Sequence, residues 1–493
     1  MLKKLLSDTA WYGLSSIVGR LINYAMVPLF TAVLPVASNG VITTLYAYAA
    51  FLNVVLTFGM ETAYFRFGRG AVPDEQQQAA RGQTLIACTS LAFLLGLSLG
   101  MPWLQAAIPY PALPTMAYLM ATFLITDALA AIPLARLRLQ GKAKLYAAYK
   151  LVPILLYVGL SSLFLLAPNA VPGLASLGDA LGAAEQPVVW VLLANLLSNA
   201  PLLALVRLQH FRPGLLATSA GGQMVRYAWP IVVMGLAGMA NQMLGILQLE
   251  RLLPPGFYPG LSNTEAVGVY GQCYKLSIFM ALVVQAFRLG AEPFFFSLAD
   301  KAHKEQGFAL VMRWFVLACI GVLVLVCINL DWIAPLVLRR PVYLTGLGVV
   351  PTLLAANLFL GIYYNLSVWF KLTDQTAWGT WLSLGGLVAT VTLNYLLIPA
   401  WGYEGAAVAT LVCYLAMAAA SYLVGQRYMP VPYPVVWITF GVGLAYAASA
   451  AFPWLVRGLP AWQVWAWRVA YAGVYAGWVA TELLKLRRRP AVV

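Results

Sequence analysis

The sequence contains very little charge. Only 9% of its 493 residues are Asp, Glu, Lys or Arg, whereas 62% are hydrophobic. A soluble protein is roughly one quarter charged, so this chain cannot cover a globular surface with polar groups. The scarcity of charge excludes a cytosolic enzyme, a secreted module and a disordered chain, and it indicates a polytopic membrane protein.

Histidine and cysteine are also scarce, with two and five residues respectively. The histidines lie in polar loops, and the cysteines show neither a CxxC motif nor metal-ligand spacing, so we expect no metal site and no His-centred triad. The phosphate-binding GxxxxGK[ST] loop and the HExxH motif are absent. We therefore expect no cofactor, no covalent chemistry and no enzyme in the usual sense.

Long apolar runs are abundant. A transmembrane helix needs about 20 mostly apolar residues, whereas a barrel strand needs only about 10 in alternating pattern. The apolar runs here are too long for strands, so the sequence predicts an all-α polytopic protein with about fourteen transmembrane helices. These are expected at 9–34, 39–66, 83–108, 113–138, 145–167, 187–207, 224–250, 264–292, 308–330, 345–370, 376–398, 403–425, 433–453 and 461–483.

The basic residues are distributed unevenly between the loops. If the N-terminus is inside, 23 of the 30 Lys and Arg residues fall on inner segments, as the positive-inside rule requires. This predicts cytoplasmic N- and C-termini and explains the net charge of +14 without a nucleic-acid partner. The basic tail 485–489 fits an anchor on anionic membrane lipids.

An internal repeat is suggested by similar residues in the same order. Residues 10–23 and 228–241 both begin with Ala-Trp and end with Asn, and a Gly-x-Glu follows at 59–61 and at 290–292. Chance recurrence in a low-complexity apolar chain is the alternative. The repeat predicts two six-helix lobes and an added helix pair, at 1–215, 216–428 and 429–493.

Two cations fall near the middle of predicted helices. Arg20 is followed by Asn23, and Lys275 is preceded by Gln272. A charged group at mid-bilayer costs about 3 kcal/mol, so it usually faces a partner or a wet cavity. Arg offers a planar fork and Lys a point charge for a diphosphate or another anionic head group. These four residues are the predicted substrate-binding site.

Asp127 is the only acid predicted at mid-depth. It is interpreted either as the counter-ion of Arg20 or as a site for H⁺ or Na⁺ coupling. If it pairs with Arg20, Gln272 or backbone carbonyls could hold Lys275 instead of a substrate anion.

Four charged residues lie near the predicted inner ends of the second and eighth helices, namely Glu61, Arg66, Arg288 and Glu292. Their spacing suits local ion pairs, and an inner gate is the second interpretation. Arg468 is expected to extend to the outer interface, as long basic side chains often do.

Four segments resemble a known group of proteins: 58–67 (FGMETAYFRF), 268–279 (GVYGQCYKLSIF), 285–294 (QAFRLGAEPF) and 402–410 (GYEGAAVAT). Together with the 6+6+2 helices, they resemble the multidrug/oligosaccharidyl-lipid/polysaccharide (MOP) exporter superfamily, which includes MATE transporters. Within it, the chain resembles the Wzx-type polysaccharide (O-antigen) flippases. The resemblance covers nearly the whole chain.

The resemblance implies a V-shaped pair of lobes around a cationic lumen in the bacterial inner membrane. Such a flippase moves a polyprenyl-diphosphate-linked oligosaccharide from the cytoplasmic to the outer leaflet by alternating access, and polysaccharide polymerase or ligase machinery would be its partner. A lipid II flippase is an alternative, although its Arg-rich stretch with Asp-Ala-Phe is absent from 20–41. A cation-coupled multidrug exporter is another alternative, although that branch usually has twelve helices.

Overall fold

The computed structural model describes residues 17–68, 72–108, 110, 112–168, 173–206, 211–212, 214, 218–298 and 304–487. Regular structure in these ranges is helical. The chain divides into two compact units, Met1–Met243 and Leu244–Val493. The division at 215/216 and 428/429 expected from the sequence remains a prediction.

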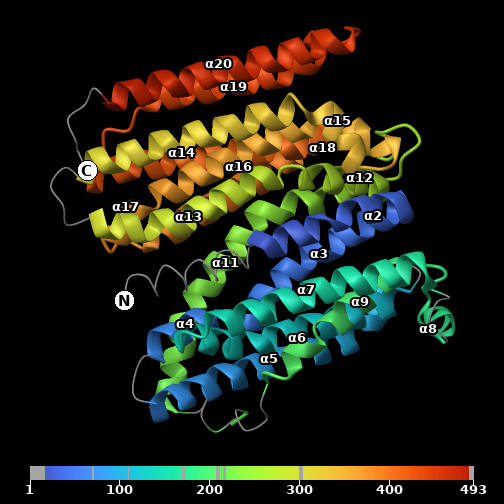
Figure 1. The fold of residues 1–493 in the computed structure, drawn as a ribbon. Helices are drawn as coiled ribbons and strands as arrows, with labels where there is room; N and C mark the ends of the chain where they lie inside the picture. The colour runs from blue at the N-terminus through green and yellow to red at the C-terminus, as the bar shows by residue number, and fades with distance from the viewer. Residues whose placement is uncertain are drawn as a thin grey trace. The chain divides into compact units, whose positions relative to one another are not determined.

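The first unit is a bundle of helices in which α5, α6, α7 and α9 lie side by side (Figure 1). A helical stretch from Ile17 leads into α2. The helices are α2 (Met26–Val33), α3 (Val36–Thr57), α4 (Met60–Phe67), α5 (Val72–Ala107), α6 (Leu113–Leu139), α7 (Ala143–Leu166), α8 (Leu174–Leu181), α9 (Val188–Ser198), α10 (Ala200–Leu203) and the first part of α11 (Ser219–Leu252).

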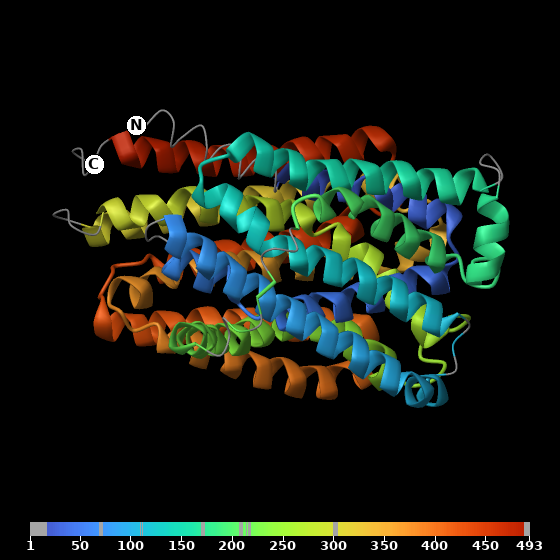
Figure 2. The same ribbon diagram turned by 90° about the horizontal axis from the view of Figure 1, so that it is seen from below.

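The second unit begins within α11 and is also helical, with its helices lying lengthwise beside one another in both views (Figure 1; Figure 2). Its elements are α12 (Asn263–Lys275), α13 (Ile278–Leu298), α14 (Lys304–Cys327), α15 (Leu330–Val337), the short 3₁₀ helix η4 (Pro341–Gly346), α16 (Val349–Leu366), α17 (Val368–Leu372), α18 (Ala377–Tyr428), α19 (Val435–Leu455) and α20 (Ala461–Arg487).

Burial identifies the central helices of each unit. In the first unit, 56% of the apolar stretch of α6 is buried against 17% of that of α7. In the second, 78% of the stretch formed by α16 and α17 is buried, because α12, α13, α14 and α18 all pack against α16. Large exposed apolar side chains remain on the outer helices, including Trp103, Trp381 and Val436, as expected where lipid replaces water.

Nine helices in the described ranges are long and apolar enough to cross a membrane, or ten if the bent pair α12–α13 is one span. Each of the fourteen ranges predicted from the sequence overlaps a helix or a helical stretch. The all-helical, multi-span fold is confirmed, and the number fourteen remains a prediction.

Helix α18 is an antiparallel hairpin although its hydrogen bonding is nearly continuous. Gly402 has a non-helical backbone with φ 59° and ψ −136°, a conformation that suits glycine. Across the bend, the Thr390 hydroxyl donates to Cys413 Sγ at 3.1 Å, and Trp378 Nε1 donates to the Tyr428 hydroxyl at 3.4 Å. The two spans predicted at 376–398 and 403–425 therefore lie beside each other.

The turn of this hairpin is held from the loop between α11 and α12. Tyr258 stacks on Tyr403 with ring centroids 4.3 Å apart, and its hydroxyl accepts the backbone N–H of Tyr403 at 3.1 Å. Burial raises the pKa of Tyr258, so the hydroxyl stays protonated at physiological pH. Gly402 and Gly405 in the 402–410 motif are therefore explained by packing rather than by chemistry.

A Gly405→Ala substitution should prevent this turn from closing. An added Cβ would lie 2.3 Å from the Leu397 carbonyl oxygen, and such overpacking costs about 3 kcal/mol. We expect a large loss of folded protein, measured as the monodisperse fraction in detergent chromatography. The matched control is Gly443→Ala in α19, where nothing lies within 4 Å of an added Cβ. Equal yields from both variants would contradict the packing described.

Candidate functional site

The strongest candidate site is a break in a membrane helix of the second unit. Helix α12 ends at Lys275, α13 begins at Ile278, and the two axes differ by 47°. At the break, the backbone N–H groups of Leu276 and Ser277 bond three residues back, to Cys273 and Tyr274. This tighter turn ends the regular helix in the interior of the unit. Discontinuous helices of this kind often form transporter sites.

Lys275 lies at the C-terminal end of α12, where carbonyl groups without helical partners favour a cation. Its Nζ donates to Gln272 Oε1 at 3.1 Å, and Gln272 is completely buried. This is the contact that the sequence offered as an alternative to a bound anion. Gln272 is a neutral partner, so it orients the ammonium group without neutralising its charge.

The break is fixed to the neighbouring helices by polar contacts. The Ser277 hydroxyl accepts from Asn357 Nδ2 of α16 at 3.4 Å, and Cys273 Sγ donates to the carbonyl of Tyr343 in η4 at 3.2 Å. Tyr270 and Tyr274 lie on the same helix with ring centroids 6.2 Å apart. Lys275 is thus held by a rigid, largely buried frame rather than by a mobile loop.

The other residues predicted to bind substrate lie in the first unit. Arg20 and Asn23 are exposed on the helical stretch that precedes α2. Asp127 lies half-buried in α6. The interpretation of Asp127 as a counter-ion remains a prediction. The predicted convergence of Arg20 and Lys275, and cation coupling at Asp127, remain predictions.

The predicted local ion pair between Glu61 and Arg66 is wrong. Glu61 instead pairs with Arg138 of α6 at 2.6 Å, while the Arg66 guanidinium lies 4.5 Å from the ring centroid of Tyr227. The reason is a break between α3 and α4, where Phe58 and Gly59 both have left-handed backbones. This break changes the direction in which the side chains of α4 project.

Arg288 in the second unit, like Arg66 in the first, lies against an aromatic ring. The Arg288 guanidinium lies 5.2 Å from the ring centroid of Tyr364 in α16. The side chain of Glu292 lies outside the described part of the chain. The gate formed by these residues with Glu61 and Arg66 remains a prediction.

Sequence reasoning missed a partly buried ion pair at the same end of the first unit. Arg136 Nε lies 3.0 Å from Glu75 Oε1, and the Tyr64 hydroxyl donates to the same carboxylate. Glu75 and Arg136 are 61 residues apart in the chain. No local spacing rule connects residues that far apart, so only the packing of α4, α5 and α6 identifies them.

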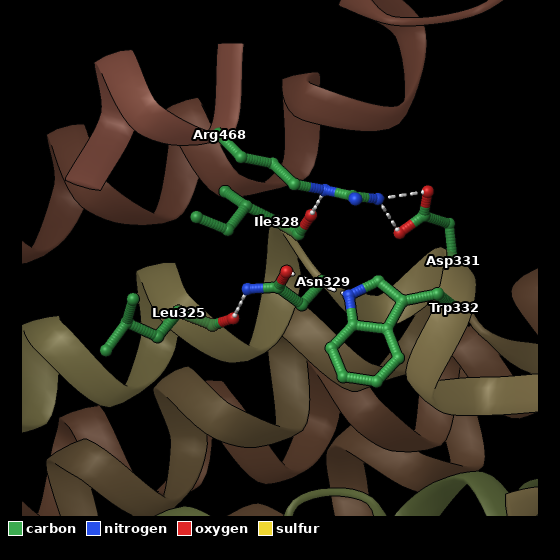
Figure 3. A network of polar contacts seen from close by, with 6 residues as sticks. All are labelled: Leu325, Ile328, Asn329, Asp331, Trp332 and Arg468. Carbon is green, nitrogen blue, oxygen red and sulfur yellow. Dashed lines mark hydrogen bonds and ion pairs between the residues drawn. The ribbon is translucent and has the colours of Figure 1, made fainter. Parts of the chain in front are cut away.

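Arg468 is held by contacts within the second unit, and its predicted reach to the outer interface remains a prediction. Its Nε donates to the carbonyl of Ile328 at 2.9 Å, and its Nη2 reaches both oxygens of Asp331 at 2.6 and 2.5 Å. Figure 3 shows this contact beside Asn329, which accepts from Trp332 Nε1 at 2.9 Å. The guanidinium therefore fixes the turn between α14 and α15, and it draws α20 into the second unit.

The described residues contain no group of three or more His, Cys, Asp or Glu side chains placed to hold a metal ion. At the break of the bent helix, the described residues place the Lys275 cation beside the neutral Gln272. Such a group can attract an anion electrostatically.

No protein-family model matches the chain, and no curated protein matches it. Solved structures do match. The lipid II flippase MurJ in an inward closed conformation has a TM-score of 0.71 at 10% identity, covering 96% of this chain and 99% of that one. An inward-facing multidrug resistance MATE family transporter of the MOP superfamily has a TM-score of 0.65 at 11% identity, covering 83% and 94%.

A MATE transporter, VcmN, from Vibrio cholerae has a TM-score of 0.58 at 15% identity, covering 86% of this chain and 96% of that one. Each of the three alignments covers more than nine tenths of the chain in the solved structure. The likeness therefore extends through both units. The fold of this chain is that of the MATE transporters and of the MOP superfamily.

Proposed function

We propose that this chain is a flippase that moves a polyprenyl-diphosphate-linked oligosaccharide from the cytoplasmic to the outer leaflet of a bacterial inner membrane by alternating access. The observation that carries the proposal is Lys275, a cation at the break of a bent helix whose partner is the neutral Gln272. A diphosphate head group would supply the missing negative charge.

The MOP-like fold supports transport across a membrane. The proposed Wzx-type specificity for surface polysaccharide precursors rests on the resemblance of the four sequence segments. Arg20 and Asn23 of the first unit would contribute further contacts to the diphosphate during the cycle. The enzymes that polymerise or ligate the sugar would receive the flipped product. Both termini would lie in the cytoplasm.

Two alternatives have specific observations in their favour. The likeness to MurJ favours lipid II as the carried lipid. The half-buried carboxylate of Asp127 in α6 suits a cation-coupled exporter of drugs.

The test is complementation of three bacterial strains that respectively lack their polysaccharide flippase, their lipid II flippase or their main drug exporter. We expect restored surface polysaccharide in the first strain and no rescue in the others. Rescue of viability in the second strain, or of drug resistance in the third that Asp127→Asn abolishes, would replace the proposal. Failure in all three, with the protein present in the membrane, would argue against transport of these substrates.

A further inference from the structure

Arg81 is a buried cation that the proposed function does not use. It lies in α5, and only 7% of its surface is exposed. Its one polar contact in the described part of the chain is a long one, from Nη2 to Gln77 Oε1 at 3.5 Å. No carboxylate in that part of the chain neutralises it.

Other enclosed arginines of the same protein are treated differently. Arg136, Arg313 and Arg468 each contact a carboxylate within 3.0 Å, and their side chains are 22%, 23% and 8% exposed. Each of these three enclosed guanidinium groups therefore has a carboxylate beside it. Arg81 is more enclosed than Arg136 or Arg313 and yet lacks such an acid. A guanidinium cannot escape the cost of burial by losing its proton.

The surroundings of Arg81 are rigid. The neighbouring Gly82 abuts Ile132 of α6, and Gln83 Nε2 donates to the Leu129 carbonyl at 2.9 Å. One turn further along α5, Thr84 Oγ1 accepts the backbone N–H of Arg212 at 2.9 Å. This contact brings the segment that carries the exposed Arg212 side chain close to the same face of α5.

We infer that Arg81 is the centre of an anion site for a phosphate oxyanion, separate from the break at Lys275. A guanidinium matches phosphate through its planar fork, and the bound anion would supply the charge that the fold omits. Because the positive-inside rule places this end of α5 at the inner surface, the phosphate would come from an inner-leaflet lipid head group or from free phosphate.

The test compares melting temperatures of the purified full-length protein. In detergent, inorganic phosphate is compared with chloride at equal ionic strength. In nanodiscs, phosphatidylglycerol is compared with phosphatidylcholine. We expect a saturable rise with one or both anionic probes, since a ligand that binds only the folded state stabilises it. A rise with inorganic phosphate indicates a free oxyanion, and a rise with phosphatidylglycerol alone indicates a lipid head group.

Variants assign the effect to Arg81. Arg81→Gln should lose the rise, and Arg81→Lys should keep part of it, because a point charge replaces the fork. The matched control is Lys142→Gln, which removes an exposed cation from the turn between α6 and α7 and should respond like wild type. No rise in the wild type, or an undiminished rise in both Arg81 variants, overturns the inference. If Arg81→Gln does not fold, the responses of Arg81→Lys and of the wild type still test whether Arg81 binds the anion.

Discussion

Replacing Lys275 by alanine is expected to slow transport strongly while leaving the protein in the membrane. The ammonium group is the charge at the break between α12 and α13, and its described partner is the neutral Gln272 at 3.1 Å. A charge-assisted contact is worth about 2 kcal/mol, so its loss should slow flipping by about tenfold or more. The measurement is surface polysaccharide in the complemented strain, normalised to the amount of protein.

Three variants separate charge from shape. Lys275→Arg should retain part of the activity because it keeps the positive charge. Lys275→Met should be as inactive as the alanine variant, although it fills the space. Lys144→Ala removes an exposed cation in α7 and should behave as wild type. Full activity of both Lys275→Ala and Lys275→Met would show that Lys275 does not bind the substrate. The proposed flippase function would then be tested only by complementation of the three strains.

Removing the carboxylate of Asp331 should cause a large loss of stability. Arg468 is 8% exposed, whereas Asp331 is 55% exposed. An Asp331→Ala variant would leave the enclosed guanidinium with the carbonyl of Ile328 but without a counter-charge. Breaking a buried pair in this way costs about 3 kcal/mol. The melting temperature in detergent should fall accordingly.

A double-mutant cycle isolates this pair. Arg468→Met removes the charge that needs a partner, so Asp331→Ala should cost much less in that background. Without Arg468, the half-exposed carboxylate of Asp331 can be hydrated by water. We therefore expect Arg468→Met alone to lower the melting temperature less than Asp331→Ala alone. Additive effects in the cycle would show that the contact in Figure 3 contributes little to stability.

The helical fold could be predicted because it depends on local composition. Every apolar run long enough to span a bilayer overlaps a helix, and even the closely spaced pair at 376–425 was separated at the right place, beside Gly402. Lys275 and Gln272 could be paired from the sequence because they are three residues apart on one helix.

The remaining contacts could not be predicted because they join distant parts of the chain. Arg468 and Asp331 are 137 residues apart, and Glu61 and Arg138 are 77 apart. The left-handed backbone at Phe58 also has no signal in the sequence, since a non-glycine residue rarely adopts it. It is this bend that directs Glu61 to α6 rather than to Arg66.

The hairpin of α18 also bears on how the chain enters the bilayer during synthesis. Its two halves are joined at Gly402 with almost no intervening loop. The ribosome–translocon machinery therefore has no hydrophilic segment of any length to carry across between these spans. The two halves can pair as they emerge and partition into lipid together, with the Thr390–Cys413 and Trp378–Tyr428 contacts already within reach. This part of the protein would then enter the bilayer as a helical hairpin rather than one span at a time.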